Sequence, residues 1–542
     1  MAMVYANVAE PFIESVRRHP EKLAVIHGEA TSTYQEMNDR INQTARFLTE
    51  DLGVASGDRV AYLLPNGVEI LEIYYAVQKV GAIAVPLNFK LIAREIAYLV
   101  VASGSSVLLF ADQFADKVLE ASSSLAAEVH LVSTGGAVDG CRQLEPLRNG
   151  KSSAEPELFV GSSALSRIQY TGGSTGLPKG AARTHHADLI ELDGVLDSNG
   201  LGDDPNNVVL IQCPLEHHGG HSWFTATFAA GATLIICDVF DAEGILRRIE
   251  RHRVTHMILL PPTTYGRLLG CSAIGDYDLS SVRLVQSAAG GVSRQIVEMI
   301  YDRFPHAILN YGWGQSESGL GTSLVITRAM LAEDSPLLAS IGKPMKHMRI
   351  KLVDEGGEDV CQGGIGEALV CCEAVMEGYY GQEELTRSAF TADGWLRTGD
   401  MMSRDREGYY TLQSRKKDMI KSGGENVFVG EVERTLRLHP AVADCVVFGT
   451  RDAVMGEAVA AVVELKPGAT CTADELRAHC RSLIASYKKP RYIVFTDALG
   501  RNDAGKVRKD DVVSFFNEHR NEANLRPREA GGASRALLPL LA

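Results

Sequence analysis

The sequence predicts an α/β protein of more than one domain, built around a mainly parallel β-sheet. Short apolar segments with the period of strands alternate with longer segments that have the period of helices, as in βαβ units. The chain has 542 residues, which is more than a single hydrophobic core usually supports. Its apolar content of 45% and mean hydropathy of −0.03 are typical of a globular protein.

The elements follow one another from the amino-terminal end. Apolar residues recur one helical turn apart in residues 34–49, which predicts a helix. The segments that continue the alternation are strand 59–64, helix 68–80, strand 82–85, strand 106–111 and strand 129–132. Residues 166–170 alternate as a short strand would, and residues 187–196 predict a helix behind a polar cap. The stretch between them is therefore expected to be a strand-to-helix loop.

Composition excludes several classes of protein. The net charge of −14 leaves no basic footprint for a nucleic acid at the level of the whole chain. The ten cysteines include no Cys-x-x-Cys pair, so neither a zinc site nor a disulfide framework is expected. Residues 1–22 lack the apolar core of a signal peptide, and no segment is long enough to span a bilayer. A cytoplasmic protein is predicted.

Residues 170–180 read Tyr-Thr-Gly-Gly-Ser-Thr-Gly-Leu-Pro-Lys-Gly. Glycines let backbone N–H groups approach an anion closely, and hydroxyl and amine side chains add donors, so this stretch predicts a polyphosphate site. It is not a P-loop, because Lys179 follows a proline and no Ser or Thr follows it. A flexible glycine turn without a ligand is the alternative. The candidate ATP-binding residues are Thr171, Gly172, Gly173, Ser174, Thr175, Gly176 and Lys179.

This stretch resembles the Thr-Ser-Gly-Thr-Thr-Gly-x-Pro-Lys-Gly signature of the adenylate-forming superfamily. That superfamily includes acyl- and aryl-CoA ligases, luciferases and peptide-synthetase adenylation domains. Gly172 stands where the family usually has serine, so one hydroxyl contact to the phosphates is expected to be absent. The motifs occur in the family's order over about residues 20–515.

Residues 310–317, Asn-Tyr-Gly-Trp-Gly-Gln-Ser-Glu, offer two aromatic-Gly pairs. The family pattern aromatic-Gly-x-Thr-Glu favours Trp313-Gly314 over Tyr311-Gly312. The resemblance implies that Trp313 stacks on adenine, Ser316 bonds phosphate and Glu317 holds Mg²⁺. A core aromatic is the alternative for Trp313, but it leaves the adjacent Ser-Glu pair unexplained.

Three further segments predict nucleotide binding only weakly when each is taken alone. The small residues around Gly290 would let a flat ring lie against the backbone, although the family usually has a proline where Gly291 stands. Asp400 ends a Thr-Gly-Asp segment that resembles the ribose motif, and a turn cap is its alternative. Arg415 resembles a nucleotide-contacting arginine, although Ser414 replaces the glycine that usually precedes it.

Three histidines within five residues, His217, His218 and His221, raise a metal hypothesis. No second acidic or cysteine cluster of ligand spacing accompanies them, which disfavours it. The superfamily has a histidine followed by x-Gly-Gly here, between the acyl pocket and the thiol tunnel, and His217 fits that position. A loop histidine that bonds a carbonyl is the alternative.

The resemblance also implies the domain organisation. It predicts a large amino-terminal domain of stacked mixed β-sheets with flanking helices, and a small mobile carboxyl-terminal α/β lid. The predicted ranges are 1–414 for the large adenylation domain, 415–417 for the hinge, 418–525 for the lid and 526–542 for a flexible tail. Lys417 would be the residue about which the lid turns.

The predicted function is that of an ATP-dependent carboxylate–CoA ligase with ATP, Mg²⁺ and coenzyme A. The resemblance implies that Lys506, in a Gly-Lys loop, offsets negative charge while acyl-AMP forms, and that Gly423 and Gly424 line the thiol tunnel. Lys90 falls where some aryl-CoA ligases carry an arginine for CoA phosphates. A solvated surface lysine is its alternative.

The acyl substrate is less defined. The small residues Gly194, Gly312 and Gly319 predict a roomy pocket, which suits a small-molecule aryl, alicyclic or medium- to long-chain carboxylate. A stand-alone enzyme that loads a carrier protein is an alternative, and a catalytically silent nucleotide-binding regulator is another. The sequence leaves open whether the protein assembles as a homodimer.

Overall fold

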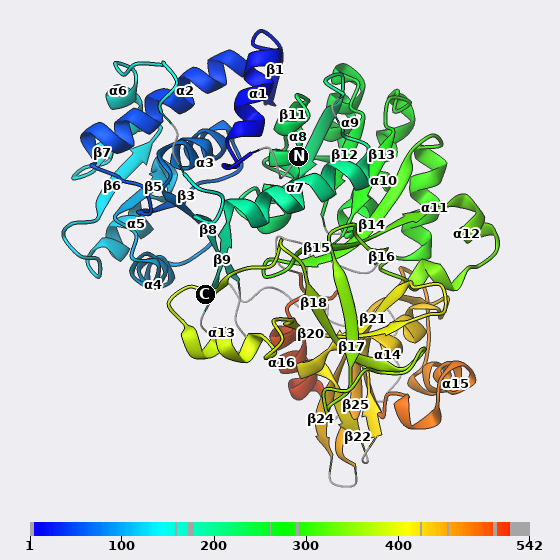
Figure 1. The fold of residues 1–542 in the computed structure, drawn as a ribbon. Helices are drawn as coiled ribbons and strands as arrows, with labels where there is room; N and C mark the ends of the chain where they lie inside the picture. Colours follow the sequence, from blue (N-terminus) through cyan, green and yellow to red (C-terminus); the bar gives the residue numbers. More distant parts are fainter. Residues whose placement is uncertain are drawn as a thin grey trace. The chain divides into compact units, whose positions relative to one another are not determined.

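The computed structural model has the predicted α/β fold (Figure 1). It describes residues 5–157, 160–171, 178–202, 204–260, 262–288, 292–422, 425–452, 455–501 and 507–520. Of these, residues 263, 417, 421, 425, 426 and 456 are described by their backbone alone. The chain forms a large unit, Met1–Ile350 with Val370–Leu396, and a small unit, Lys351–Leu369 with Arg397–Ala542.

Within the residues that the structure describes, the large unit contains two β-sheets. The order of the eight-stranded sheet is β19 (Gly378–Tyr379), β9 (Lys179–Thr184), β8 (Leu165–Thr171), β4 (Ile83–Leu87), β3 (Arg59–Leu63), β5 (Val107–Ala111), β6 (His130–Thr134) and β7 (Arg142–Gln143). The order of the nine-stranded sheet is β16 (Lys343–Pro344), β15 (Gly319–Ile326), β14 (Ile308–Gln315), β13 (Leu284–Ser287), β12 (His256–Leu259), β10 (Val208–Gln212), β11 (Thr233–Ile236), β1 (Leu23–His27) and β2 (Ala30–Thr33). The first sheet is parallel from β8 to β7 and the second from β14 to β1, with antiparallel pairs beyond.

Helices flank both sheets. They are α1 (Glu10–Arg18), α2 (Tyr34–Arg46), α3 (Val68–Val80), α4 (Ala93–Ser103), α5 (Ala115–Ser122), α6 (Leu144–Arg148), α7 (His185–Asn199), α8 (His218–Ala229), α9 (Ala242–His252), α10 (Thr263–Leu269), α11 (Arg294–Arg303), α12 (Arg328–Ala332) and α13 (Glu383–Ala389). Local sequence sets several of their ends. Thr33 and Glu36 form a capping box at the start of α2, and α3 ends at Gly81, whose φ of 75° suits a residue without a side chain.

The predicted elements of the first 134 residues are confirmed. Helix 68–80 is α3, and helix 34–49 begins as α2 and ends in a π-helical turn over Phe47–Asp51. The predicted strands are β3, β4, β5 and β6, all parallel to their neighbours.

The expected strand-to-helix loop after residue 170 is wrong. The chain returns from β8 directly into the antiparallel strand β9, and α7 begins only at His185. The sequence of β9, Lys-Gly-Ala-Ala-Arg-Thr, has no alternation of polar and apolar residues and few strand-favouring side chains, so its strand pairing was not visible. The glycine-rich stretch therefore connects two paired strands.

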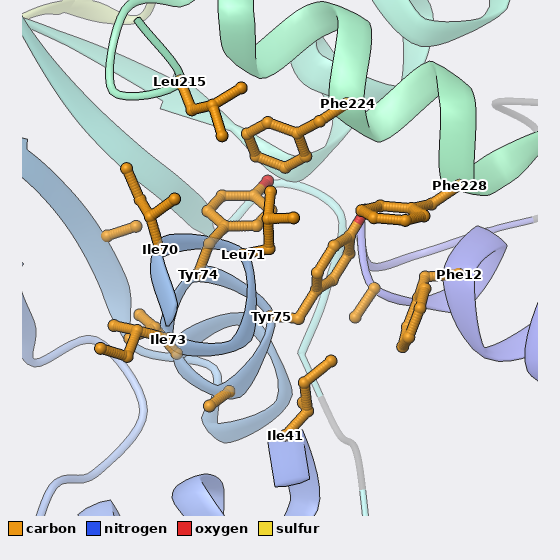
Figure 2. Packing of buried hydrophobic residues seen from close by; sticks show 14 of the residues in the cluster. Phe12, Ile41, Ile70, Leu71, Ile73, Tyr74, Tyr75, Leu215, Phe224 and Phe228 are labelled. Atoms are coloured by element: carbon orange, nitrogen blue, oxygen red, sulfur yellow. The ribbon is translucent and has the colours of Figure 1, made fainter. Parts of the chain in front are cut away.

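The core of the large unit lies where α3 meets α1 and α8 (Figure 2). Tyr75 of α3 stacks on Phe12 of α1 at a centroid distance of 4.7 Å, and Tyr74 packs edge-on against Phe224 of α8 at 5.3 Å. Val60 of β3 and Val209 of β10 belong to the same buried cluster, so it joins both sheets. This packing fixes α8, which begins beside His217.

The described part of the small unit also contains two sheets. Four strands pair in the order β17 (Arg349–Val353), β18 (Ile365–Cys371), β20 (Leu396–Arg404) and β21 (Tyr410–Arg415). The second sheet comprises β23 (Glu425–Val427), β22 (Ile420–Ser422), β25 (Gly456–Leu465), β24 (Val442–Asp452) and β26 (Tyr492–Thr496). Its helices are α14 (Val429–Arg437), α15 (Ala473–Leu483) and α16 (Lys509–His519). Residues 351–369 and 397–414 thus belong to the same compact unit as the C-terminal residues, and the division at residue 414 stays a prediction.

Candidate active site

The candidate phosphate-binding stretch is carried by the β8–β9 hairpin. Thr171, the last residue of β8, is directly opposite Lys179, the first residue of β9. Gly172, Gly173, Ser174, Thr175 and Gly176 lie outside the described residues. The structure therefore places the two ends of the stretch side by side, and the phosphate-binding role of its residues stays a prediction.

A second hairpin carries the aromatic-Gly-x-Ser-Glu segment. Strands β14 and β15 pair antiparallel, with an irregularity between Trp313 and Gly314. Trp313 is only 7% exposed, and a Cβ atom placed on Gly321 would lie 2.6 Å from the indole ring. One face of that ring therefore rests on its own hairpin. Ser316 and Glu317 are half-buried in the turn that follows.

A tyrosine that sequence reasoning missed connects the two hairpins. The Tyr379 hydroxyl donates a hydrogen bond to Oε1 of Glu317 at 3.1 Å, and the Lys179 ammonium lies 5.3 Å from the centroid of the Tyr379 ring. Tyr379 belongs to the two-residue strand β19, which pairs with β9. The backbone N–H of Met376 also donates to the carbonyl of Glu317, at 2.8 Å. Lys179 and Glu317 are thus held beside one ring.

Glu317 offers the type of ligand that a magnesium ion uses. In the described part of the chain, no group of three or more His, Cys, Asp and Glu side chains is arranged to hold a metal. Mg²⁺ does not need such a cage, because it is commonly bound by one or two carboxylates together with substrate phosphates and water. The oriented carboxylate of Glu317 suits that mode of binding.

The three histidines of the 217–221 segment have different environments. His217 is half-buried just before α8, and its Nε2 lies 3.4 Å from Nδ2 of Asn88. His218 and His221 are buried: His218 contacts Arg167 at 2.9 Å, and His221 lies 2.8 Å from the Tyr74 hydroxyl. Burial lowers the pKa of both. His217 is therefore the accessible member of the group.

Glu216, directly before His217, is a buried carboxyl group that the sequence did not single out. It is 3% exposed, and neither carboxyl oxygen meets hydrogen-bond geometry with a partner in the described chain. Burial raises its pKa to about 7, and its own backbone N–H and the charge of Lys90 offset only part of this effect. Lys90 itself is exposed, and its backbone N–H donates to Oδ1 of Asn88.

The glycines predicted to line the acyl pocket permit close packing. A Cβ atom on Gly194 would lie 2.4 Å from the ring of His347, and one on Gly312 would lie 2.5 Å from the carbonyl oxygen of Thr322. Gly319, at φ 72°, approaches the carboxyl group of Glu191. Protein atoms therefore fill the space that side chains would take at these positions. That the three glycines line an acyl pocket stays a prediction.

In the small unit, the predicted ribose and nucleotide residues form an ion pair. Asp400 is directly opposite Arg415 in the β20–β21 pair, and its Oδ1 lies 2.8 Å from Arg415 Nε. Asp400 is 1% exposed, whereas the Arg415 side chain is about half exposed. The backbone of Lys417 lies in the turn that follows. Gly290, Gly423, Gly424 and Lys506 lie outside the described residues.

Comparison with known proteins identifies the family. Residues 12–380 match the family model of the AMP-binding enzymes, and residues 431–506 match that of the AMP-binding enzyme C-terminal domain. The chain belongs to the AMP-binding enzymes. This adenylate-forming family includes enzymes with a large amino-terminal and a small carboxyl-terminal domain. Among the residues that the structure describes, no helix combines the length and apolar character needed to cross a membrane.

Several relatives of this AMP-binding enzyme are CoA ligases. A feruloyl-CoA synthase from Amycolatopsis sp is 35% identical over 93% of this chain and 98% of that protein. The anthranilate CoA ligase AuaEII, solved with anthranoyl-AMP, has a TM-score of 0.86 and 26% identity, covering 96% of this chain and all of that one. The amide bond synthetase McbA from Marinactinospora thermotolerans has a TM-score of 0.83 and 26% identity, covering 94% and 99%. These matches support AMP-forming, ATP-dependent acyl-CoA ligation, for which this class of enzyme uses ATP, Mg²⁺ and CoA.

Proposed function

We propose that this enzyme activates an aryl carboxylic acid, with alicyclic and medium- to long-chain acids as further candidates, and transfers the acyl group to CoA. In the first step a carboxylate oxygen bonds to the α-phosphorus of ATP and pyrophosphate leaves, so acyl-AMP forms. In the second step the CoA thiol loses its proton, its sulfur bonds to the acyl carbon, and AMP leaves. The feruloyl-CoA synthase and anthranilate CoA ligase relatives support an aryl acid as the first choice.

The contact chain from Lys179 through Tyr379 to Glu317 carries this proposal. A triphosphate needs a cation near its oxygens and a carboxylate that shares Mg²⁺ with it, and these two groups flank one tyrosine ring. When bound, Mg²⁺ neutralises charge that develops on the departing pyrophosphate. Trp313 and Ser316, on the hairpin of Glu317, would contact adenine and phosphate, with Gly290 and Gly314 allowing close approach.

The remaining roles come from the family's motifs. Asp400 would accept hydrogen bonds from the ribose hydroxyls, with Arg415 beside it. Lys506 would offset the negative charges of the carboxylate and the α-phosphate as they approach. Rotation about Lys417 would then withdraw Lys506 and present Gly423 and Gly424 to the thiol. One site would thus serve both half-reactions.

The acceptor is the second part of the proposal. Lys90 would contact CoA phosphates, and His217 would separate the acyl pocket from the thiol tunnel. Because Lys90 is exposed, such a contact is worth only about 1 kcal/mol and weakens with salt. We also place the enzyme in the cytoplasm and propose a homodimer, which sedimentation velocity would test.

A panel of carboxylic acids tests the proposal. Pyrophosphate release is measured with aryl, alicyclic and fatty acids, in parallel with CoA, pantetheine, a carrier protein and a simple amine as acceptors. An aryl acid should give the highest kcat/KM, and CoA should be the preferred acceptor. Preference for a carrier protein or an amine as acceptor would show that the protein is another kind of adenylate-forming enzyme and not a CoA ligase. If no acid gave pyrophosphate release, the alternative of a nucleotide-binding regulator would be favoured.

A further inference from the structure

A network of four buried charged side chains lies inside the large unit. Arg167 and Arg183 are 1% and 0% exposed, and Asp188 and Glu191 are also buried. Asp188 accepts from Nε and Nη2 of Arg167, both at 3.0 Å, and from Nε of Arg183 at 2.7 Å. Glu191 Oε2 accepts from Nη2 of Arg183 at 2.7 Å. Two positive and two negative charges thus balance.

Such a network is not a source of stability by itself. Removing four charged groups from water costs much of what their mutual attraction returns, so apolar residues of similar volume often serve stability as well. Burial by itself would raise the pKa of both carboxyl groups. Arg167 and Arg183 nevertheless hold the pKa of Asp188 below its usual range, and His218, followed by Arg183, does the same for Glu191. All four side chains are therefore charged at neutral pH. The contacts of this network with neighbouring backbone segments therefore matter more than its contribution to stability.

The network reaches the turn that carries Glu317. Nη1 of Arg183 donates to the carbonyl oxygens of Ser316, at 3.4 Å, and of Ala374, at 2.8 Å. Oε1 of Glu191 accepts from the backbone N–H of Leu320 at 3.2 Å. Arg183 and Glu191 thus bond the backbone on both sides of Glu317.

The same network fixes the other two motif segments. Arg167 and Arg183 belong to β8 and β9, the strands of the candidate phosphate hairpin. On the opposite side, Ser222 of α8 donates to Glu191 at 2.8 Å, and His218 lies 2.9 Å from it. The helix that begins beside His217 is therefore bound to the same carboxyl group. One buried cluster touches three segments that are far apart in the sequence.

We propose that Arg183 and Glu191 are positioning residues, which hold the Ser316–Gly319 turn against the phosphate hairpin and thereby set the Glu317 carboxylate for Mg²⁺-nucleotide. This inference rests on the proposed function, because it takes Glu317 as the magnesium ligand. Both side chains are buried. Their effect passes through the backbone of the turn.

Glu191→Gln tests the role, since glutamine keeps the size of the side chain and removes its charge. ATP binding is followed by tryptophan fluorescence at increasing Mg²⁺ without any acid, and pyrophosphate exchange is followed with the preferred acid. We expect the Mg²⁺ concentration for half-maximal binding to rise at least about tenfold. The charge-balanced Arg183→Gln/Glu191→Gln variant should regain much of the lost thermal stability while its Mg²⁺ requirement stays raised.

Glu72→Gln is the matched control. Glu72 is 1% exposed and also pairs with two arginines, Arg148 at 2.8 Å and Arg40 at 2.6 Å. It lies on α3 and, within the described part of the chain, forms no hydrogen bond or ion pair with the three motif segments. The variant should leave the Mg²⁺ requirement unchanged. Equal Mg²⁺ requirements of Glu191→Gln and wild type, or an equal rise in Glu72→Gln, would overturn the positioning role. Failure of wild type to release pyrophosphate would refute the proposed ligase and leave the binding measurement as a test of positioning.

Discussion

Replacing Tyr379 by phenylalanine isolates one contact in the site. The change removes the hydroxyl that donates to Glu317 at 3.1 Å and keeps the ring beside Lys179. A hydrogen bond to a charged group contributes about 1.5–3 kcal/mol. Because both residues are half-buried, the lower value applies, and about 1.5 kcal/mol corresponds to roughly a tenfold change.

ATP–pyrophosphate exchange at varied Mg²⁺ measures this effect. Tyr379→Phe should lower kcat/KM for MgATP about tenfold, and saturating Mg²⁺ should recover part of the loss. Tyr380→Phe is the control, because Tyr380 packs beside an apolar core cluster and should leave the exchange unchanged. Exchange by Tyr379→Phe within twofold of wild type at every Mg²⁺ concentration would refute the reasoning.

Three other substitutions test separate parts of the account. Glu216→Gln should raise the free energy of unfolding above pH 7. In the folded protein the pKa of Glu216 is raised from 4.5 to about 7. The ionised, buried carboxylate therefore destabilises the wild-type fold increasingly between pH 4.5 and 7, by about 3 kcal/mol at most. Urea unfolding at pH 5 and pH 8 measures this, and an identical pH slope in both proteins would contradict it. Trp313→Ala should raise KM for ATP about fivefold or more through lost stacking, whereas the same effect from Tyr311→Ala alone would select the other aromatic. Lys506→Ala should abolish pyrophosphate release yet make thioester from supplied acyl-AMP, and unimpaired release would remove its assigned role.

Helices and buried strands with clear periodicity could be predicted from sequence. Helix α3 was predicted with its observed bounds, because apolar residues on most sides of residues 68–80 and Gly81 at the end mark a buried helix. Strand β9 could not, because its small and polar residues gain their strand pairing only from β8. The period of a segment shows which face is buried, but not which strand pairs with it.

The family motifs gave the candidate site, but not the residues that support it. Tyr379 meets Glu317 across 62 residues of chain, so no local pattern connects them. Arg167 and Arg183 would be expected at the surface, since arginine is rarely buried without a partner. The one local signal is on α7, where Asp188 and Glu191 are three residues apart and therefore share a helix face.

The route of the carboxylate oxygen tests the central claim most directly. The preferred acid is labelled with ¹⁸O in its carboxylate and incubated with ATP, Mg²⁺ and CoA. The masses of the products are then measured by mass spectrometry. Activation through acyl-AMP predicts AMP that carries one ¹⁸O atom, together with pyrophosphate without label and the acyl-CoA thioester. Formation of ADP with ¹⁸O in inorganic phosphate, or of AMP without label, would contradict the account.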